Sequence, residues 1–252
     1  MKLLLEEMTR DEAAAAFAQN ALVVLPTGSI EQHGPHLPLV VDTAVVTHVA
    51  RAAAGRAAEQ VPVVVTPTAH FGVSHHHLAF AGTMSLTSSL YIECIKELVR
   101  CLYRNGARRV VLLNGHGGNQ HPNGVVAAAL TSEDGLEMSI GQVSYWTAAA
   151  AALEAAGAAD VAPSYPGHAG GFETSLMLAL RPDLVQLEKR RAPLATLSSD
   201  VGAVVYGAFT RAGGTSDDAS RADTKKGERL LEAAVGAVAD YLLRFHKGTA
   251  GA

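Results

Sequence analysis

The sequence predicts an α/β protein with a mostly parallel central sheet that helices cover on both faces. Three observations support this: short, uniformly apolar runs rich in β-branched residues, helical stretches between them, and Gly-rich turns where the runs end. Uniformly apolar strands are typical of parallel sheets, because both faces of such a sheet are buried. We therefore expect a three-layer α/β/α sandwich. No composition shift or internal repeat divides the chain, so we expect a single domain over residues 1–252.

Four apolar runs predict the strands of this sheet. The clearest is Ala21-Leu-Val-Val-Leu-Pro26, which Thr27-Gly28-Ser29 ends. The other expected strands cover residues 61–66, 109–114 and 138–145.

Helical periodicity predicts the connecting elements. The best pattern covers residues 88–105, where Ser88 or Ser89 can cap the start and Asn105-Gly106 stops the helix. Further helices are expected at 43–60, 123–131, 172–180 and 225–245, and a flexible loop at 213–220.

Composition excludes several classes of protein. With 20 Lys+Arg against 24 Asp+Glu and no basic block, no nucleic-acid partner is expected. The apolar run near the N-terminus meets Glu6 and Glu7 at once and is too short for a signal peptide or a membrane span. Cys94 and Cys101 fall in one predicted helix, where a rise of about 10 Å puts them beyond disulfide reach. We expect both to be buried small hydrophobes and the protein to be cytoplasmic.

Polar residues gather in three Gly-rich loops. One follows the first strand over residues 29–36, a second follows the third strand over 115–119, and a third covers 166–175 and leads into a helix. Ligands of open α/β sheets bind at the carboxyl ends of the strands. These loops are therefore expected to converge on one site.

The first loop carries residues suited to a divalent cation. Glu31 and His33 are two apart, so in an extended segment both point to the same side. A carboxylate beside an imidazole suits Zn²⁺, Mn²⁺ or Fe²⁺. Asp42 precedes a predicted helix, where an N-cap role and a metal-bridging role both remain open.

The other two loops are each ambiguous alone. His116 lies between glycines, as in a phosphate loop, but the Lys-Ser/Thr signature of such loops is absent. Glu173 falls in a first helical turn, where a carboxylate also favours the helix dipole. The tract His75-His76-His77 is expected to line the cleft rather than to bind one ion. The remaining histidines are interpreted as local, structural or surface residues: His36, His48, His70, His121 and His246.

Taken together, these segments resemble the creatininase (creatinine amidohydrolase) family. The matching motifs are Thr27-Gly-Ser-Ile-Glu-Gln-His-Gly-Pro-His-Leu-Pro-Leu39 with Asp42, Phe80-Ala-Gly-Thr-Met-Ser-Leu86, Asn114-Gly-His-Gly-Gly-Asn119 and His168-Ala-Gly-Gly-Phe-Glu-Thr-Ser175. They span most of the chain in the family's order, and the first is long and specific.

The resemblance implies a three-layer α/β/α fold, a hexamer and a site with two metal ions, Zn²⁺ or Mn²⁺ with Fe²⁺ as a further option. By that likeness Glu31 and His116 hold one metal, His33 and Glu173 hold the other, and Asp42 bridges them. His168 matches a histidine that acts in proton transfer.

Further residues match positions near the substrate in creatininase. Ser74, Ser164 and Tyr165 fall near substrate contacts, and Trp146 matches an aromatic residue of a mobile flap. The backbone N–H groups around Gly117 are expected to face a developing oxyanion.

One departure bears on the substrate. Creatininase has a tyrosine and a catalytic glutamate after the histidine of the third motif, where this chain has Gly117 and Gly118. The loss of that carboxylate argues against creatinine and for another small amide, cyclic amide or formamide.

We therefore expect an amidohydrolase that cleaves a C–N bond with a hydroxide shared by two metal ions. Two alternatives stay open: a ring-opening hydrolase or lyase acting on a keto-sugar or lactone, and a non-catalytic module that binds a metabolite. A phosphate-binding domain is disfavoured, because it leaves Glu31, Asp42 and Glu173 unexplained.

Overall fold

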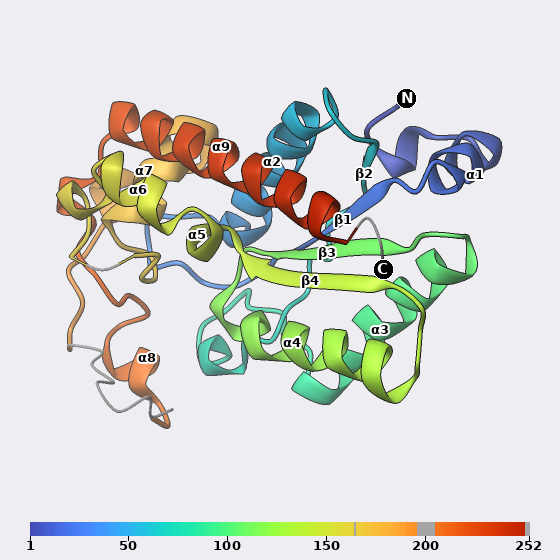
Figure 1. The fold of residues 1–252 in the computed structure, drawn as a ribbon. Coiled ribbons are helices and arrows are strands. Elements are labelled where there is room, and N and C mark those ends of the chain that lie inside the picture. The colour runs from blue at the N-terminus through green and yellow to red at the C-terminus, as the bar shows by residue number, and fades with distance from the viewer. Residues whose placement is uncertain (164, 196–204, 250–252) are drawn as a thin grey trace.

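A four-stranded parallel sheet forms the centre of the molecule (Figure 1). The computed structural model describes residues 1–163, 165–195 and 205–249. The strands are β1 (Leu22–Thr27), β2 (Val63–Val65), β3 (Arg109–Asn114) and β4 (Ser139–Ser144), in the order β2-β1-β3-β4. Every neighbouring pair is parallel. The predicted parallel sheet is thus confirmed.

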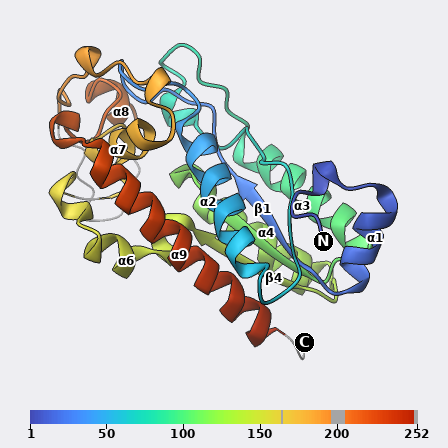
Figure 2. The same ribbon diagram turned by 90° about the horizontal axis from the view of Figure 1, so that it is seen from above.

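Helices cover both faces of the sheet, as Figures 1 and 2 show. One face carries α2 (Val41–Ala57), α7 (Gly171–Leu180) and α9 (Thr224–Gly248), with the short α5 (Tyr145–Ala148) and α6 (Ala150–Ala155). The other carries α3 (Ser88–Arg104) and α4 (Gln120–Ala128), with α1 (Arg10–Ala18) beside α3. Over the described ranges, no helix is long and apolar enough to cross a bilayer.

Strand β1 shows why its sequence is apolar from Leu22 to Pro26. Leu22 and Val24 pack into the core under α2 and α9, whereas Val23 and Leu25 pack into the core under α3 and α4. Successive side chains of a strand point to opposite faces, so a strand between two helical layers buries all of them. The three-layer α/β/α architecture follows from this double burial.

Helix α3 matches its prediction except at two points. Its cap is Thr87, whose hydroxyl accepts a hydrogen bond from the Leu90 amide, rather than Ser88 or Ser89. Cys94 and Cys101 are unpaired, as expected, but both are exposed, so the prediction that they are buried is wrong. They lie on the solvent side of a helix whose apolar stripe is formed by Tyr91, Ile95 and Val99.

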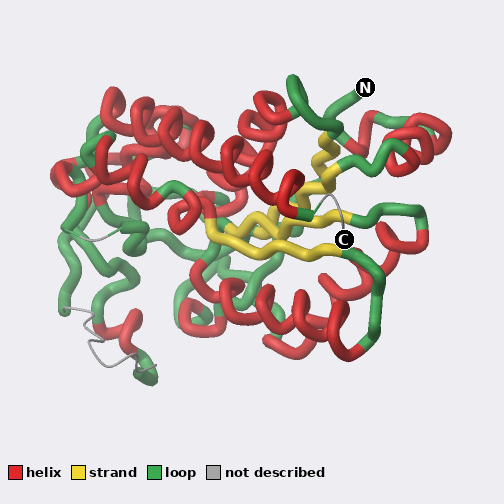
Figure 3. The backbone as a smooth tube through the Cα atoms, viewed as in Figure 1, coloured by secondary structure: helices red, strands yellow, loops and turns green. Residues whose placement is uncertain are grey.

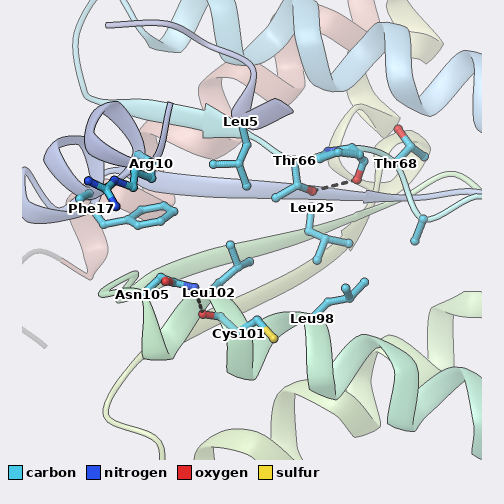
Figure 4. A pocket seen from close by; sticks show the side chains of 14 residues that line it. Leu5, Arg10, Phe17, Leu25, Thr66, Thr68, Leu98, Cys101, Leu102 and Asn105 are labelled. Carbon is cyan, nitrogen blue, oxygen red and sulfur yellow. Dashed lines mark hydrogen bonds between the residues drawn. The ribbon is translucent and has the colours of Figure 1, made fainter. Parts of the chain in front are cut away.

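A largely apolar groove lies between α1 and α3, next to β1 and the segment that follows β2 (Figure 4). Its volume is about 530 Å³, and Phe17, Leu25, Leu98 and Leu102 line it. It carries no histidine and no carboxylate among its lining residues.

The loops with the predicted ligands gather away from this groove, at the carboxyl ends of the strands (Figure 3). The loop after β1 leads into α2, the loop after β3 leads into α4, and the loop before α7 approaches both. A short helix, α8 (Ala208–Arg211), lies beyond them.

Candidate metal centre

The three predicted loops meet in a cavity of about 100 Å³ at the carboxyl end of the sheet. The structure brings together all five residues that the sequence indicated as ligands, and each of them is at most 6% exposed. The cavity is lined by Glu31, Asp42, His76, His77, Gly115, His116, Gly117, Trp146, Pro166, Gly167, His168, Glu173 and Phe209.

Asp42 lies at the centre of the cluster. Its Oδ1 is 3.2 Å from His33 Nε2, and its Oδ2 is 3.0 Å from His116 Nδ1. Asp42 is the second residue of α2, and the N-cap is Val40, which makes no side-chain cap hydrogen bond. Of the two roles that the sequence left open, the structure therefore shows no N-cap and shows one carboxylate oxygen facing each imidazole.

The other two carboxylates each face one of these histidines. Glu31 Oε2 is 3.3 Å from His116 Nδ1, and Glu173 Oε2 is 3.8 Å from His33 Nε2. Two groups of three ligands thus share Asp42. The backbone places them: β1 and β3 are neighbours, so the loops that follow them exit side by side.

Hydrogen bonds on the far side of each ring fix where the lone pairs point. His33 Nδ1 is 3.1 Å from the carbonyl oxygen of Glu31, and His116 Nε2 is 3.0 Å from that of Val73. A carbonyl oxygen only accepts, so each of these nitrogens carries a hydrogen. The remaining nitrogens, Nε2 of His33 and Nδ1 of His116, are therefore free to bind a cation among the carboxylates.

Without a metal, protons take its place between these groups. Burial disfavours the charged form of His33, but the carboxylates of Asp42 and Glu173 outweigh it and raise the pKa of His33 to about 10. Burial likewise opposes charge on His116, but Glu31 and Asp42 raise its pKa to about 9. Burial raises the pKa of Glu173 to about 8 and also raises that of Glu31. The site therefore holds extra protons near neutral pH.

The spacing and chemistry of the donors fit a pair of divalent cations. Ligand atoms on a tetrahedral Zn²⁺ with bonds of about 2.0–2.2 Å lie about 3.3–3.6 Å apart. The four carboxylate–imidazole separations, two of them to the shared Asp42, come close to that spacing. Asp42 Oδ2 is also buried without an aligned hydrogen-bond partner, which a cation would supply. A cation also needs imidazole nitrogens with free lone pairs, and His33 Nε2 and His116 Nδ1 provide them.

The remaining predicted site residues divide into two groups. His168 and Gly117 line the cavity, as does Trp146. Ser74 is fully buried and contacts Ser29 Oγ at 2.5 Å and His116 Nε2 at 3.3 Å, so it supports the ligands from behind. The hydroxyl of Tyr165 donates to the carbonyl of Ala150 away from the cavity. Ser164 lies outside the described residues.

Four cavity or support residues were not identified as site residues from the sequence. His76 and His77 come from the histidine tract and line the cleft as expected, whereas the exposed His75 is not among its lining residues. The ligand atoms of His76 and His77 also fall into groups that could hold a metal ion. Phe209 of α8 packs on His77 with ring centroids 4.4 Å apart. Gln32, between two predicted ligands, contacts both His77 and His168. The run of three histidines and the position of Gln32 were the available signals.

The segment expected to be a flexible loop at 213–220 is partly buried against this cluster. Gly214 and Thr215 are buried, and the Gly214 carbonyl accepts a hydrogen bond of 2.7 Å from Gln32 Nε2. A Cβ at Gly214 would lie 2.5 Å from Gln32 Oε1, so only glycine permits this approach.

Comparison with known proteins adds a family and several relatives. The family model described as creatinine amidohydrolase matches residues 6–242. Creatinine amidohydrolase of Pseudomonas putida is 33% identical over 260 residues, covering 92% of this chain and 93% of that protein. The mycofactocin precursor peptide peptidase of Mycobacterium tuberculosis (strain H37Rv) is 34% identical over 223 residues, covering 84% and 81%. The 3-dehydro-scyllo-inosose hydrolase of Thermotoga maritima is 31% identical over 117 residues, covering 44% and 35%.

Solved structures show the same fold in proteins that contain metals. A creatininase described as its Mn form and a creatininase variant described as Zn-Zn type each match with a TM-score of 0.78 and 31% identity. Both matches cover 97% of this chain and 98% of the other. The described residues of this chain place buried groups of histidines and carboxylates where they are able to hold such metals.

Proposed function

The chain belongs to the creatininase family of amidohydrolases, and from this premise we propose that it hydrolyses a C–N bond of a small linear or cyclic amide or formamide with two divalent cations. The observation that supports it most is the shared carboxylate of Asp42, with one oxygen facing His33 and the other facing His116. In this proposal Glu31, His116 and Asp42 hold one cation, and His33, Glu173 and Asp42 hold the other. Zn²⁺ and Mn²⁺ suit this donor set.

When bound, two such cations would supply an activated hydroxide and would polarise the carbonyl group of the substrate. The chain's own contribution is to fix the tautomers of His33 and His116, through the carbonyl oxygens of Glu31 and Val73. The burial of all five ligands also excludes bulk water.

His168 is proposed to move the proton. Its Nε2 is 2.9 Å from the carbonyl oxygen of Gln32, so that nitrogen carries the hydrogen and Nδ1 has the free lone pair. Burial and the neighbouring His33 hold the pKa of His168 well below its usual value, so the ring is neutral at pH 7. Nδ1 can therefore accept a proton from the attacking water and pass it to the leaving nitrogen.

The substrate is proposed to be small and to differ from creatinine. A cavity of about 100 Å³ is well below the roughly 300–1,000 Å³ of sites for drug-sized ligands. Position 118 has no room for a side chain, since a Cβ there would lie 2.0 Å from the Val73 carbonyl oxygen. A carboxylate at this position, as creatininase has, would need a different backbone path.

Elemental analysis combined with a substrate screen tests this function. Protein purified without chelator should contain two equivalents of Zn or Mn and hydrolyse at least one member of a panel of cyclic amides, formamides and acyclic amides. His168→Gln should keep the metals and lose turnover, whereas His121→Ala, an exposed histidine on α4, should change neither. Less than one equivalent of metal in the wild type would contradict the proposal.

A second candidate is hydrolysis or ring opening of a lactone or keto-sugar. The relative named 3-dehydro-scyllo-inosose hydrolase favours it, although the match covers only 44% of this chain. The same pair of cations can polarise an ester or a ketone. Adding lactones and cyclic ketones to the panel separates the two, because an amidohydrolase should prefer the amide.

We also propose a homohexamer in the cytoplasm, which the family likeness supports. The groove also carries one half-exposed leucine of α3, Leu98 at 47% exposure, which a contact between subunits would cover. Sedimentation analysis of the purified protein checks the assembly, and cell fractionation checks the location.

A further inference from the structure

Two buried polar residues behind Glu31 have no part in the proposed chemistry. His77 is fully buried in the short turn His75–His77, and its Nε2 lies 3.4 Å from Glu31 Oε1. Its Nδ1 lies 2.9 Å from the side-chain nitrogen of Gln32. His77 Nε2 has no other hydrogen-bond partner in the described part of the chain, although polar atoms at this depth normally have one.

The orientation of the Gln32 amide follows from two backbone contacts. Its Oε1 accepts a hydrogen bond of 2.9 Å from the Gly34 amide, and its Nε2 donates one of 2.7 Å to the Gly214 carbonyl. Flipping the amide would set oxygen against oxygen at Gly214 and N–H against N–H at Gly34. The Gln32 nitrogen is therefore a donor, and one N–H group remains to be placed.

Only one of the two neighbouring imidazoles can accept that remaining N–H group. His168 Nε2 lies 2.9 Å from Gln32 Nε2, but it also lies 2.9 Å from the Gln32 carbonyl oxygen, which can only accept. His168 Nε2 is thus already a donor. The remaining hydrogen of Gln32 goes to His77 Nδ1, and the hydrogen of neutral His77 must then be on Nε2.

We propose that His77, held by Gln32, is a positioning residue that donates a hydrogen bond from Nε2 to Glu31 Oε1 and so directs Glu31 Oε2 toward the cation beside His116. The inference rests on the proposed metal site. Ser29 Oγ lies 3.2 Å from Oε2, so the carboxylate is contacted on both oxygens. The 3.4 Å separation is longer than the usual N–H···O hydrogen bond, so the proposed donation requires the two side chains to approach each other.

The same placement of hydrogens argues against a competing arrangement. Glu31, His77 and His168 offer ligand atoms close enough together to hold a metal ion themselves. A nitrogen that carries a hydrogen cannot ligate, however, so His77 Nε2 supports the carboxylate instead of binding a third cation. Partners of metal ligands that are themselves not ligands typically change metal affinity by about 10–100-fold when they are removed.

The first test reads the hydrogen directly. In ¹⁵N–¹H long-range correlation spectra of histidine-labelled, metal-free protein, His77 and His168 should both show the Nε2–H tautomer. Gln32→Met, which removes the donor to Nδ1, should shift His77 toward a mixture of tautomers. A wild-type His77 with its hydrogen on Nδ1 overturns the inference, and it does so whether or not the protein binds metal.

The second test measures zinc affinity by competition with a chelator. His77→Phe should weaken zinc binding about 10–100-fold, and His77→Gln, which keeps a donor, should restore most of that loss. His75→Phe is the matched control in the same turn, because His75 is exposed and its Nδ1 lies 2.8 Å from Ser85 Oγ rather than beside a proposed ligand. This variant should bind zinc as the wild type does. Unchanged affinity in a folded His77→Phe variant refutes the role of His77. Failure of the wild type to bind zinc would instead refute the proposed function, while the tautomer of His77 would still decide this inference.

Discussion

The two cavities of this molecule differ in the chemistry of their lining residues, which their volumes do not show. The groove between α1 and α3 has about 530 Å³ and is lined mainly by aliphatic and aromatic side chains. The cavity at the carboxyl end of the sheet has about 100 Å³, yet it is lined by three carboxylates and four histidines. The smaller cavity is the candidate functional site, because its titratable groups are buried, close together and strongly shifted in pKa.

The difference lies in the loops rather than in the sheet that both cavities share. Leu25 of β1 faces the groove, while the loop that leaves the same strand carries Glu31 and His33 into the cluster. Open parallel sheets place their functional groups at this end of the strands. Substitutions in the two regions should therefore have separable effects on metal binding, and these can be ranked.

The largest effect is expected from Asp42→Ala. Losing the carboxylate shared by both ligand groups should weaken the binding of both cations more than about 100-fold, since even supporting residues are worth 10–100-fold. It should also leave His33 and His116 without their nearest carboxylate. Elemental analysis after dialysis measures the loss, with the exposed Asp11→Ala as control. Two retained equivalents of metal would contradict the assignment of Asp42.

The next effect compares two adjacent glycines at the cavity. In Gly118→Ala the new Cβ would lie 2.0 Å from the Val73 carbonyl oxygen and 2.6 Å from His116 Nε2, whereas nothing lies within 4 Å of a Cβ at Gly117. Gly118→Ala should therefore destabilise the fold by about 1–3 kcal/mol or more and weaken metal binding through His116. Gly117→Ala should do neither. Urea unfolding and chelator competition check both variants, and equal behaviour of the two would contradict the packing described here.

A smaller, pH-dependent effect should separate the metal-free protein from the loaded one. His33 and His116 have pKa values raised to about 10 and 9, so their contribution to stability is complete below pH 6.5 and is lost as the pH rises through those values. Glu173, raised to about 8, changes stability in the same direction, with its contribution complete below about pH 4.5. The metal-free protein should thus lose stability between about pH 6.5 and 10.

Thermal unfolding with and without chelator measures this difference. Each kcal/mol should shift Tm by about 2–4 °C in a protein of this size. The loaded protein should hold its Tm over the same range, because metal binding strengthens as ligands lose protons. A metal-free protein whose Tm rises from pH 6.5 to 9 would contradict the assigned protons.

The smallest effect is expected in the groove. Leu98→Ala removes a half-exposed side chain from its wall and should change the free energy of unfolding by only about 0.5 kcal/mol. Metal content and metal affinity should equal those of the wild type. Loss of metal in this variant would mean that the two cavities are coupled.

Much of the fold was predictable because its signals are local. The strand over residues 109–114 begins and ends as the apolar run indicates, and the helix that starts at Ser88 is set by a strong apolar stripe. The exposure of Cys94 and Cys101 was not predictable from their chemistry alone. It depends on which side of the helix faces the sheet.

The residues of the site also include some that could be predicted from the sequence and some that could not. Glu31 and His33 could be proposed as ligands from their spacing, whereas Asp42, His116 and Glu173 were each ambiguous alone and were proposed from the family resemblance. The contacts of His77 and Gln32 could not, because they depend on the path of residues 213–216, which the sequence suggested would be a free loop. Tertiary hydrogen bonds that join segments more than 40 residues apart leave no local pattern in a sequence.

The protons bound to the metal-free cluster affect how the protein takes up its metal ions. Two divalent cations would bring four positive charges into a cluster of buried side chains. His33, His116 and Glu173 each hold a hydrogen ion at neutral pH that ligation would expel. The three departing protons then offset three of the four added charges, and an unbuffered solution should turn acidic as the protein takes up its metals.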